Sequence, residues 1–308
     1  MIIFPHMDIK SAIIFATDKF KEKSIASARL DAEVLLLQSL NAGRGGKKDK
    51  SWMYLNIDEY ALSPAEEKRF KGFVARRERH EPVAYIIGRK EFYGSDFFVN
   101  KDVLIPRPET EIIVEEALKL IKGRKKRFAL MDIGTGSGCI PISILKAADA
   151  AGVSDRITEV YADDISKSAL EIAKLNARRH KAASKISFLN LDLEDALEKA
   201  RGARDLIITA NLPYVSPEDY GKLAPNVRSY EPKIAITTKD SGLYHIKRLI
   251  GKFAAISSGM ESYHIFLEAD PGQMRSIASL AKKKLPEADI KMVKDLRGKK
   301  RVMEICEG

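Results

Sequence analysis

The chain of 308 residues is 45% hydrophobic and 31% charged, which is ample for a packed core and suggests two domains. Its formal net charge of +10 favours acidic partners such as nucleic acid, but the basic residues fall in short, dispersed runs that are more typical of solvated loops and helix ends than of one binding patch. The apolar runs are too short to cross a bilayer, which excludes a membrane-spanning protein.

The cysteines and the first residues bear on where the protein works. Cys139 and Cys306 have neither metal-binding nor redox spacing, so we expect a reducing compartment, no structural zinc and no metal site. Met1–His6 carries neither a basic leader nor a cleavage site. We therefore expect a cytoplasmic protein.

Residues 8–81 are predicted to be helical, because their apolar positions recur at helical spacing in a stretch of high helix propensity. Asn41–Lys48 is rich in glycine and lysine and is predicted to be a flexible break. Ser63 is a predicted helix N-cap, followed by proline and by Glu66 at the third position, and the helix should run to about His80. We infer a small helical domain in which no chemistry of its own is visible.

A change of pattern after Tyr85 predicts strands and a rigid turn. Phe92–Gly94 and Phe97–Val99 are β-type runs separated by Ser-Asp, which predicts a hairpin. Ile105–Glu111 contains two prolines and opens a predicted helix, Ile112–Ile121. The arginine and two glutamates of this turn could line a site, or the glutamates could simply favour the start of the helix through its dipole.

From Phe128 onward, predicted strands and helices alternate. The strands are Phe128–Ile133, Ile157–Ala162, Ile186–Asn190, Asp205–Ala210, Tyr263–Glu268 and Ile290–Lys294, with a last one near Val302–Cys306. Such alternation is typical of the α/β class and predicts a doubly wound, mostly parallel sheet.

A glycine-rich loop follows the first strand of that sheet, which ends in Asp132 and Ile133. The loop consists of Gly134, Thr135, Gly136, Ser137 and Gly138. Glycines let the backbone approach a ligand closely, and the next helix points its N-terminus at the loop. The spacing G-x-G-x-G differs from the G-x-G-x-x-G of a dinucleotide site, which argues against an NAD-dependent dehydrogenase.

Two further strand ends carry carboxylates. Asp164, after the second strand, is suited to bind two ribose hydroxyls, and it is preferred to Asp163, which should alternate to the other face. Either aspartate could instead cap the next helix. After the third strand, Asp192 could meet an adenine amino group and Leu193 could cover the ring, although an ordinary strand-end turn explains this pair equally well.

The fourth strand, Asp205–Ala210, is followed by Asn211, Leu212, Pro213 and Tyr214. Because a residue before proline is pushed into an extended conformation, the Leu212 carbonyl is free to accept a hydrogen bond. With the Asn211 amide it could grip a planar NH2-bearing substrate while Tyr214 packs on its face; the alternative is a plain strand-to-turn connection. One such feature at each strand end predicts a nucleoside cofactor without a pyrophosphate, namely S-adenosylmethionine.

These motifs resemble the bacterial release-factor glutamine methyltransferases of the HemK/PrmC type, and the likeness extends over nearly the whole chain. Its segments are Glu81–Gly88, Glu91–Gly94, Ile105–Glu111 (IPRPETE), Asp132–Gly138 (DIGTGSG), Ala162–Leu170, Tyr230–Pro232, Ser241–Leu243 and Asp295–Val302. The family usually has Asn-Pro-Pro-Tyr where this chain has Leu212 in the second position, and a backbone carbonyl survives that change.

The resemblance implies a Rossmann-like class I methyltransferase sheet in residues 105–308, a helical substrate-docking domain in 1–84 and a β-hairpin linker in 85–104. It implies methyl transfer from S-adenosylmethionine to the side-chain amide nitrogen of the Gln in the Gly-Gly-Gln motif of peptide-chain release factors. A monomer is expected that requires neither a membrane nor nucleic acid.

The same resemblance assigns roles to the candidate residues. Catalysis falls to the Asn211–Tyr214 turn, which would also bind the substrate together with Arg107 and Glu109. The cofactor would be held by the glycine loop, Asp164, Asp192, Leu193 and Asn211.

Two other functions compete with this interpretation. An adenine-N6 methyltransferase on DNA or RNA could use the same turn on a flipped base, but a target-recognition domain is missing. A non-catalytic RNA- or ribosome-binding module is disfavoured because the glycine loop, Asn211, Pro213 and Tyr214 are intact.

Overall fold

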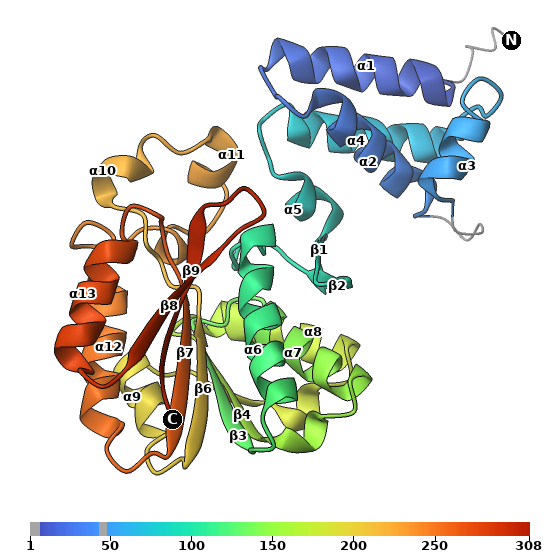
Figure 1. Ribbon diagram of the computed structural model, residues 1–308. Helices are drawn as coiled ribbons and strands as arrows, with labels where there is room; N and C mark the ends of the chain where they lie inside the picture. Colours follow the sequence, from blue (N-terminus) through green and yellow to red (C-terminus); the bar gives the residue numbers. More distant parts are fainter. Residues whose placement is uncertain (1–6, 43–47) are drawn as a thin grey trace, which may run out of the picture. The chain divides into compact units, whose positions relative to one another are not determined.

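The computed structural model describes residues 7–42 and 48–308 (Figure 1). The expectations for Met1–His6 and for most of the Asn41–Lys48 break concern positions outside these ranges. The chain forms two compact units: the first contains the chain up to Gly88 together with Pro225–Tyr230, and the second contains Arg89–Ala224 and Glu231–Gly308.

The first unit is helical, as predicted. Its helices are α1 (Ile9–Glu22), α2 (Ala28–Leu40), α3 (Lys50–Leu55), α4 (Pro64–Arg77), α5 (Val83–Ile87) and the short α11 (Pro225–Arg228). Ser63 and Glu66 form a reciprocal capping box at the start of α4, which confirms the predicted helix start. Phe20, Leu35 and Phe70 are fully buried in the apolar core of this unit.

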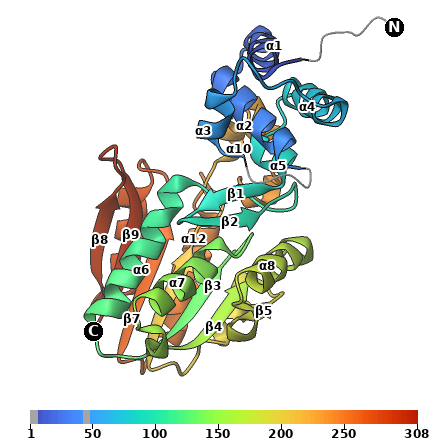
Figure 2. The same ribbon diagram turned by 90° about the vertical axis from the view of Figure 1, so that its right-hand side faces the viewer.

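A β-hairpin opens the second unit. Strands β1 (Arg89–Phe92) and β2 (Ser95–Phe98) pair antiparallel, so the predicted hairpin is confirmed, but the predicted Ser-Asp turn is wrong. The turn lies at Tyr93 and Gly94, with φ of 48° and 68°, because two successive left-handed residues match the twist of a tight hairpin. β2 packs on α8 (Lys167–Arg179; Figure 2). There, Phe98 N donates to Asn176 Oδ1 at 2.7 Å.

The second unit is built on a seven-stranded sheet in the order β5-β4-β3-β6-β7-β9-β8. The strands are β3 (Phe128–Ile133), β4 (Ile157–Asp163), β5 (Ser187–Leu189), β6 (Asp205–Ala210), β7 (Ser262–Glu268), β8 (Asp289–Lys294) and β9 (Lys300–Glu307). All neighbours from β5 to β7 are parallel, whereas β9 runs antiparallel to both β7 and β8. The predicted α/β class and the mostly parallel sheet are therefore confirmed.

Helices cover both faces of this sheet (Figure 1). One layer contains α6 (Glu111–Gly123), α7 (Cys139–Ala150) and α8, and the other contains α9 (Leu193–Glu198), α12 (Tyr244–Ile256) and α13 (Met274–Lys284). Shorter elements are α10 (Pro217–Tyr220), η1 (Pro108–Thr110), η2 (Ser154–Arg156), η3 (Ala183–Lys185) and η4 (Lys233–Ala235).

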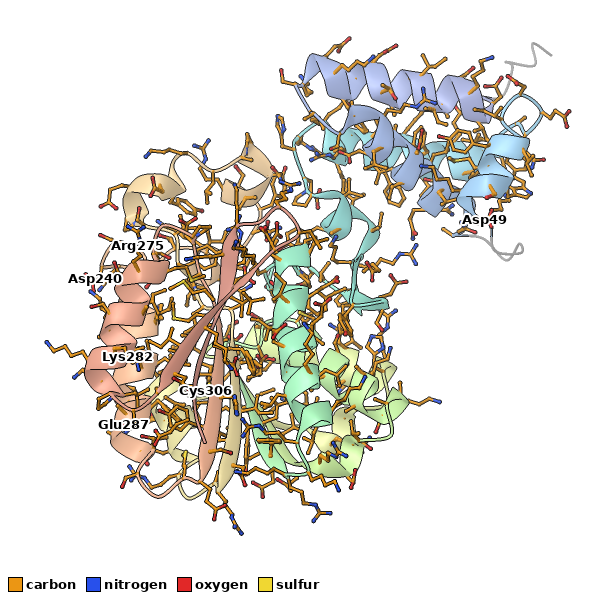
Figure 3. All side chains as sticks on the ribbon, in the orientation of Figure 1. Asp49, Asp240, Arg275, Lys282, Glu287 and Cys306 are labelled. Carbon is orange, nitrogen blue, oxygen red and sulfur yellow. The ribbon has the colours of Figure 1, made fainter. Side chains whose placement is uncertain are left out.

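The layers are amphipathic in the manner expected of helices packed on a sheet. In α13, Met274 and Ile277 are buried, while Arg275 and Lys282 are exposed to solvent (Figure 3). Strands β3 and β6 are buried along their whole length, as expected for strands covered on both faces. Within the described ranges, we find no helix with both the length and the apolarity needed to cross a membrane.

Candidate active site

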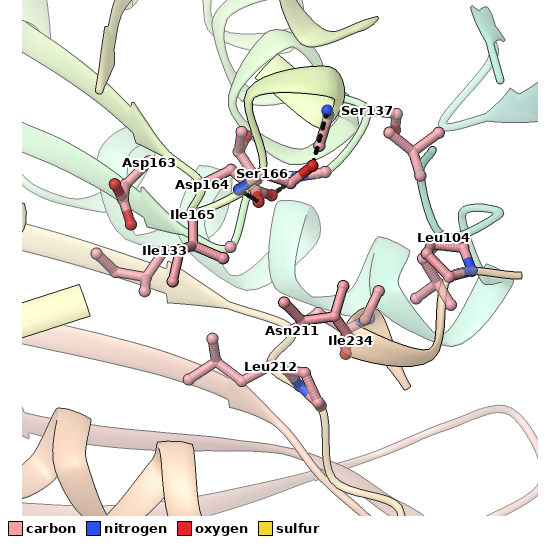
Figure 4. A pocket seen from close by; sticks show the side chains of 18 of the residues that line it. Leu104, Ile133, Ser137, Asp163, Asp164, Ile165, Ser166, Asn211, Leu212 and Ile234 are labelled. Carbon is pink, nitrogen blue, oxygen red and sulfur yellow. Dashed lines mark hydrogen bonds between the residues drawn. The ribbon is translucent and has the colours of Figure 1, made fainter. Parts of the chain in front are cut away.

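A pocket lies in the second unit at the carboxyl ends of β3, β4, β5 and β6 (Figure 4). This edge is where open parallel sheets bind their ligands. The predicted site residues that line it are Gly134, Thr135, Gly136, Ser137, Asp164, Asp192, Leu193, Asn211, Leu212 and Pro213. The remaining candidates, Gly138, Tyr214, Arg107 and Glu109, are not among its lining residues.

The glycine loop adopts a backbone that glycine favours. Gly134, Gly136 and Gly138 have φ of 71°, 54° and 76°. A side chain at Gly136 would extend into open space, so the backbone conformation and access to the pocket explain this glycine. Gly138 instead precedes α7 and lies close to α8. A Cβ added at Gly138 would be only 3.2 Å from the Cβ of Ala173. Gly138 is thus a packing position in this loop.

Asp164 connects the glycine loop to the start of α8. Its Oδ2 accepts from Gly136 N at 2.9 Å, and its Oδ1 accepts from Ser166 N at 2.9 Å. Burial raises the pKa of the Asp164 carboxyl, while these two backbone donors favour its charged form. The carboxylate therefore holds the loop and the helix start in fixed positions at the pocket wall.

Asp163 also lines the pocket, so the prediction that it faces away is wrong. Asp163 is the last residue of strand β4, and Asp164 lies in the turn after it. The two side chains therefore need not point to opposite faces of the sheet, as they would within a strand. The Asp163 side chain is buried, and its Oδ1 accepts from Leu191 N at 3.3 Å. Burial, with a smaller contribution from neighbouring Asp164, raises the pKa of Asp163 to about 7.

Asp192 stands at the N-terminus of α9 and is already paired. Its Oδ1 accepts from Leu193 N at 2.8 Å, and its Oδ2 lies 2.6 Å from Arg248 Nη2. The hydrogen bond from Arg248 lowers the pKa of the Asp192 carboxyl. Leu193 is buried at the pocket wall. Asp192 thus caps α9 and also lines the pocket, while its contact with an adenine amino group stays a prediction.

The Asn211–Tyr214 turn is held by a chain of hydrogen bonds. Asn211 Nδ2 donates to Thr110 Oγ1 at 2.9 Å, and Thr110 Oγ1 donates to Glu268 Oε2 at 2.6 Å. The Tyr214 hydroxyl donates to the other oxygen, Glu268 Oε1, at 3.3 Å. Burial raises the pKa of both the Glu268 carboxyl and the Tyr214 hydroxyl.

The Tyr214 end of the turn is fixed through its backbone as well. Gln273 Nε2 donates to the Tyr214 carbonyl oxygen at 2.9 Å. Gly242 lies so close to the same carbonyl that any side chain there would collide with it, which explains a glycine with φ of 82° at this position. The packing of Tyr214 against a substrate stays a prediction.

Arg107 and Glu109 belong to the rigid turn before α6. Arg107 Nη2 lies 2.6 Å from Oε1 of Glu231, whose side chain is fully buried. The second oxygen of Glu231 accepts from Ile105 N at 3.0 Å. This ion pair stabilises the turn, and Pro106 and Thr110 of the same turn line the pocket. Substrate binding by Arg107 and Glu109 therefore stays a prediction.

Sequence reasoning missed several residues of this site. Thr110 lies within the motif Ile105–Glu111 and Glu231 within Tyr230–Pro232, but no separate role was predicted for either residue. Glu268 is the last residue of strand β7, which was predicted only as a strand of the sheet. A polar residue at a strand end was the available signal for Glu268. Arg248 donates to Asp192 and His245 lines the pocket, but both lie on helix α12 and not at a strand end, so no strand-end signal marks them.

Comparison with known proteins agrees with this geometry. Residues 11–88 match the family model described as the PrmC N-terminal domain. A release factor glutamine methyltransferase from Rhodopirellula baltica is 34% identical over 94% of this chain and 93% of its own length. One from Leptospira interrogans is 36% identical over 96% and 97%. The hMettl16 catalytic domain, solved with an RNA hairpin, shares the fold with a TM-score of 0.51 at 16% identity, covering 76% of this chain and 81% of its own.

Proposed function

Because the chain belongs to the family of release factor glutamine methyltransferases, we propose that it methylates the side-chain amide nitrogen of the Gln in the Gly-Gly-Gln motif of peptide-chain release factors, with S-adenosylmethionine as methyl donor. The observation that carries this proposal is the orientation of the Asn211 amide. Asn211 Nδ2 donates to Thr110 Oγ1, which leaves Asn211 Oδ1 available as a hydrogen-bond acceptor at the pocket.

The nucleophile that this site must serve is weak, because the lone pair of an amide nitrogen is delocalised into its carbonyl. Asn211 Oδ1 and the Leu212 carbonyl oxygen would accept the two hydrogens of the substrate amide. Neither oxygen is occupied by another hydrogen-bond donor within the described residues. Two fixed acceptors orient the nitrogen and favour the positive charge that develops on it during transfer.

The residues of the pocket also fit a sulfonium nucleoside. Gly136 leaves open space beside a backbone that a ligand can approach closely. Asp163 and Asp164 place two carboxylates beside that loop, suited to ribose hydroxyls, and Leu193 supplies apolar cover near Asp192. Bound here, S-adenosylmethionine would supply the electrophilic methyl group.

The remaining steps fall to the protein. The Asn211–Tyr214 turn would keep the target nitrogen in line with the transferred methyl group, and rigid attachment of the turn to Glu268 and Gln273 limits its movement. After transfer, the proton on the alkylated nitrogen becomes acidic and can leave to solvent, so a strong base is not required before the reaction.

We assign substrate docking to the N-terminal helical region, residues 1–84, with the hairpin region 85–104 as connector and residues 105–308 as the catalytic domain. The support for this division is the match of residues 11–88 to an N-terminal domain of the family and the position of every pocket residue in the second unit.

The test is incubation of the protein with labelled S-adenosylmethionine and a purified release factor, its Gln→Ala variant at the Gly-Gly-Gln motif, or DNA. Label in the unaltered release factor alone supports the proposal. Label in DNA would indicate adenine-N6 methylation instead, and label in the Gln→Ala variant would place the reaction at another residue.

A further inference from the structure

A buried carboxyl group lies behind the Asn211–Tyr214 turn and takes no direct part in the methyl transfer proposed above. Glu268 ends β7, and the residues Glu268 and Thr110 are each only 2% exposed. Burying an ionised carboxyl group costs free energy unless hydrogen-bond donors compensate for the lost water. Both oxygens of Glu268 have such donors, because Oε2 accepts from the Thr110 hydroxyl and Oε1 accepts from the Tyr214 hydroxyl.

The order of donors along this chain of contacts is determined by chemistry. In its ionised form the Glu268 carboxylate only accepts hydrogen bonds, so the single Thr110 hydroxyl proton is donated to it. The Thr110 oxygen then has only lone pairs left, and it can bind the NH2 end of Asn211 but not the oxygen end. The hydroxyl donors Thr110 and Tyr214 favour the ionised form of Glu268 against the burial that raises its pKa, and in that form Glu268 determines which end of the Asn211 amide faces the pocket.

We propose that Glu268 and Thr110 are positioning residues that hold the Asn211 amide with its oxygen toward the substrate nitrogen. This inference rests on the proposed function for its catalytic consequence. In the reverse orientation, Asn211 would present an NH2 group to the substrate NH2 group, and two donors cannot bind each other. The site therefore fixes an acceptor before the substrate arrives, which is preorganisation of the kind that stabilises a transition state.

Tyr214 ties the far end of the turn to the same carboxylate. Glu268 Oε1 accepts from the Tyr214 hydroxyl, while Oε2 serves Thr110 and, through it, Asn211. Asn211, through Thr110, and Tyr214, directly, are therefore both hydrogen-bonded to Glu268 at the end of β7. This arrangement limits the movement of the four-residue turn that follows β6.

The kinetic test is a double-mutant cycle between Thr110→Val and Asn211→Ala, followed by single-turnover methylation of a release factor. Valine keeps the shape of threonine but removes the hydroxyl, and we expect a roughly tenfold to hundredfold slower rate, as when one buried hydrogen-bond partner is lost. Thr110→Ser should restore most of the rate. In the Asn211→Ala background, Thr110→Val should have almost no further effect, because a residue that acts through Asn211 has nothing left to orient. Equal effects in both backgrounds would overturn the proposal.

A second measurement does not depend on the substrate. The side-chain NH2 signals of Asn211, assigned by their loss in Asn211→Ala, should exchange slowly with solvent in the wild-type protein and rapidly in Thr110→Val. Unchanged exchange in Thr110→Val would refute the role of Thr110. If exchange responds as expected but the wild-type protein leaves release factors unmethylated, the positioning contact stands and the proposed function fails.

Discussion

Replacing Asp164 with alanine should weaken cofactor binding without unfolding the protein. The wild-type carboxylate accepts from Gly136 N and Ser166 N, both at 2.9 Å, and it faces the pocket at the position proposed for the ribose. Alanine removes the support of the glycine loop and the proposed ribose contact together.

The size of the effect follows from these contacts. A hydrogen bond to a charged group contributes about 1.5–3 kcal/mol, and a loss of that size at the ligand raises Kd by roughly ten- to 150-fold. The Ser166 contact bears on the start of α8 and should appear in protein stability rather than in ligand affinity. Asp164→Asn, which keeps the shape and one acceptor oxygen, should lie between alanine and the wild type.

Calorimetric titration with S-adenosylmethionine and with its demethylated product measures this effect directly. Asp289→Ala provides a matched control, because it removes an exposed aspartate from β8, at the opposite edge of the sheet from β5. The reasoning would be refuted by an unchanged Kd in Asp164→Ala, or by an equal loss in Asp289→Ala.

Four further outcomes are expected. Asn211→Ala should lower kcat about a hundredfold or more, with little change in cofactor Kd, and loss of cofactor binding at a normal rate would contradict its role. Leu212→Pro should keep the methylation rate, since only the carbonyl of that position is used, and a large loss of rate would show that the Leu212 side chain matters. Removing residues 1–80 should preserve cofactor binding, measured on the soluble fragment, but abolish methylation of whole release factor; an unchanged kcat/KM would refute docking by this region. Finally, burial raises the pKa of Asp163 to about 7, so the native state binds a proton that the unfolded state releases, and this contribution to stability is lost as pH rises from about 4 to about 7. Asp163→Asn should flatten that part of the profile of unfolding free energy against pH, and an identical slope would contradict the assignment.

Local patterns were sufficient to predict the order of the elements. The buried strands β3 and β6 and the Ser63 capping box depend on residues within a few positions of one another, and each was found where expected. The hairpin turn was misplaced because Gly94 looked like the end of a strand. Its left-handed conformation, together with that of Tyr93, instead places the turn there.

The site was less predictable, because its contacts join distant parts of the chain. Thr110 and Glu268 are 158 positions apart, so their hydrogen bond exists only once η1 and the end of β7 are brought together by the fold. Asp163 was excluded by an alternation rule that ends with the strand itself. Spacing could place candidate residues at the right edge of the sheet, but it could not show which of them hold the others.

The most direct test of the central claim is mass spectrometry of a purified release factor after reaction with this protein and S-adenosylmethionine. We predict a single added methyl group on the Gln of the Gly-Gly-Gln peptide, located on its side-chain nitrogen, and no added methyl group when Asn211→Ala replaces the wild-type enzyme over the same short reaction time. Methylation at any other residue, or at the same rate with Asn211→Ala, would contradict the account.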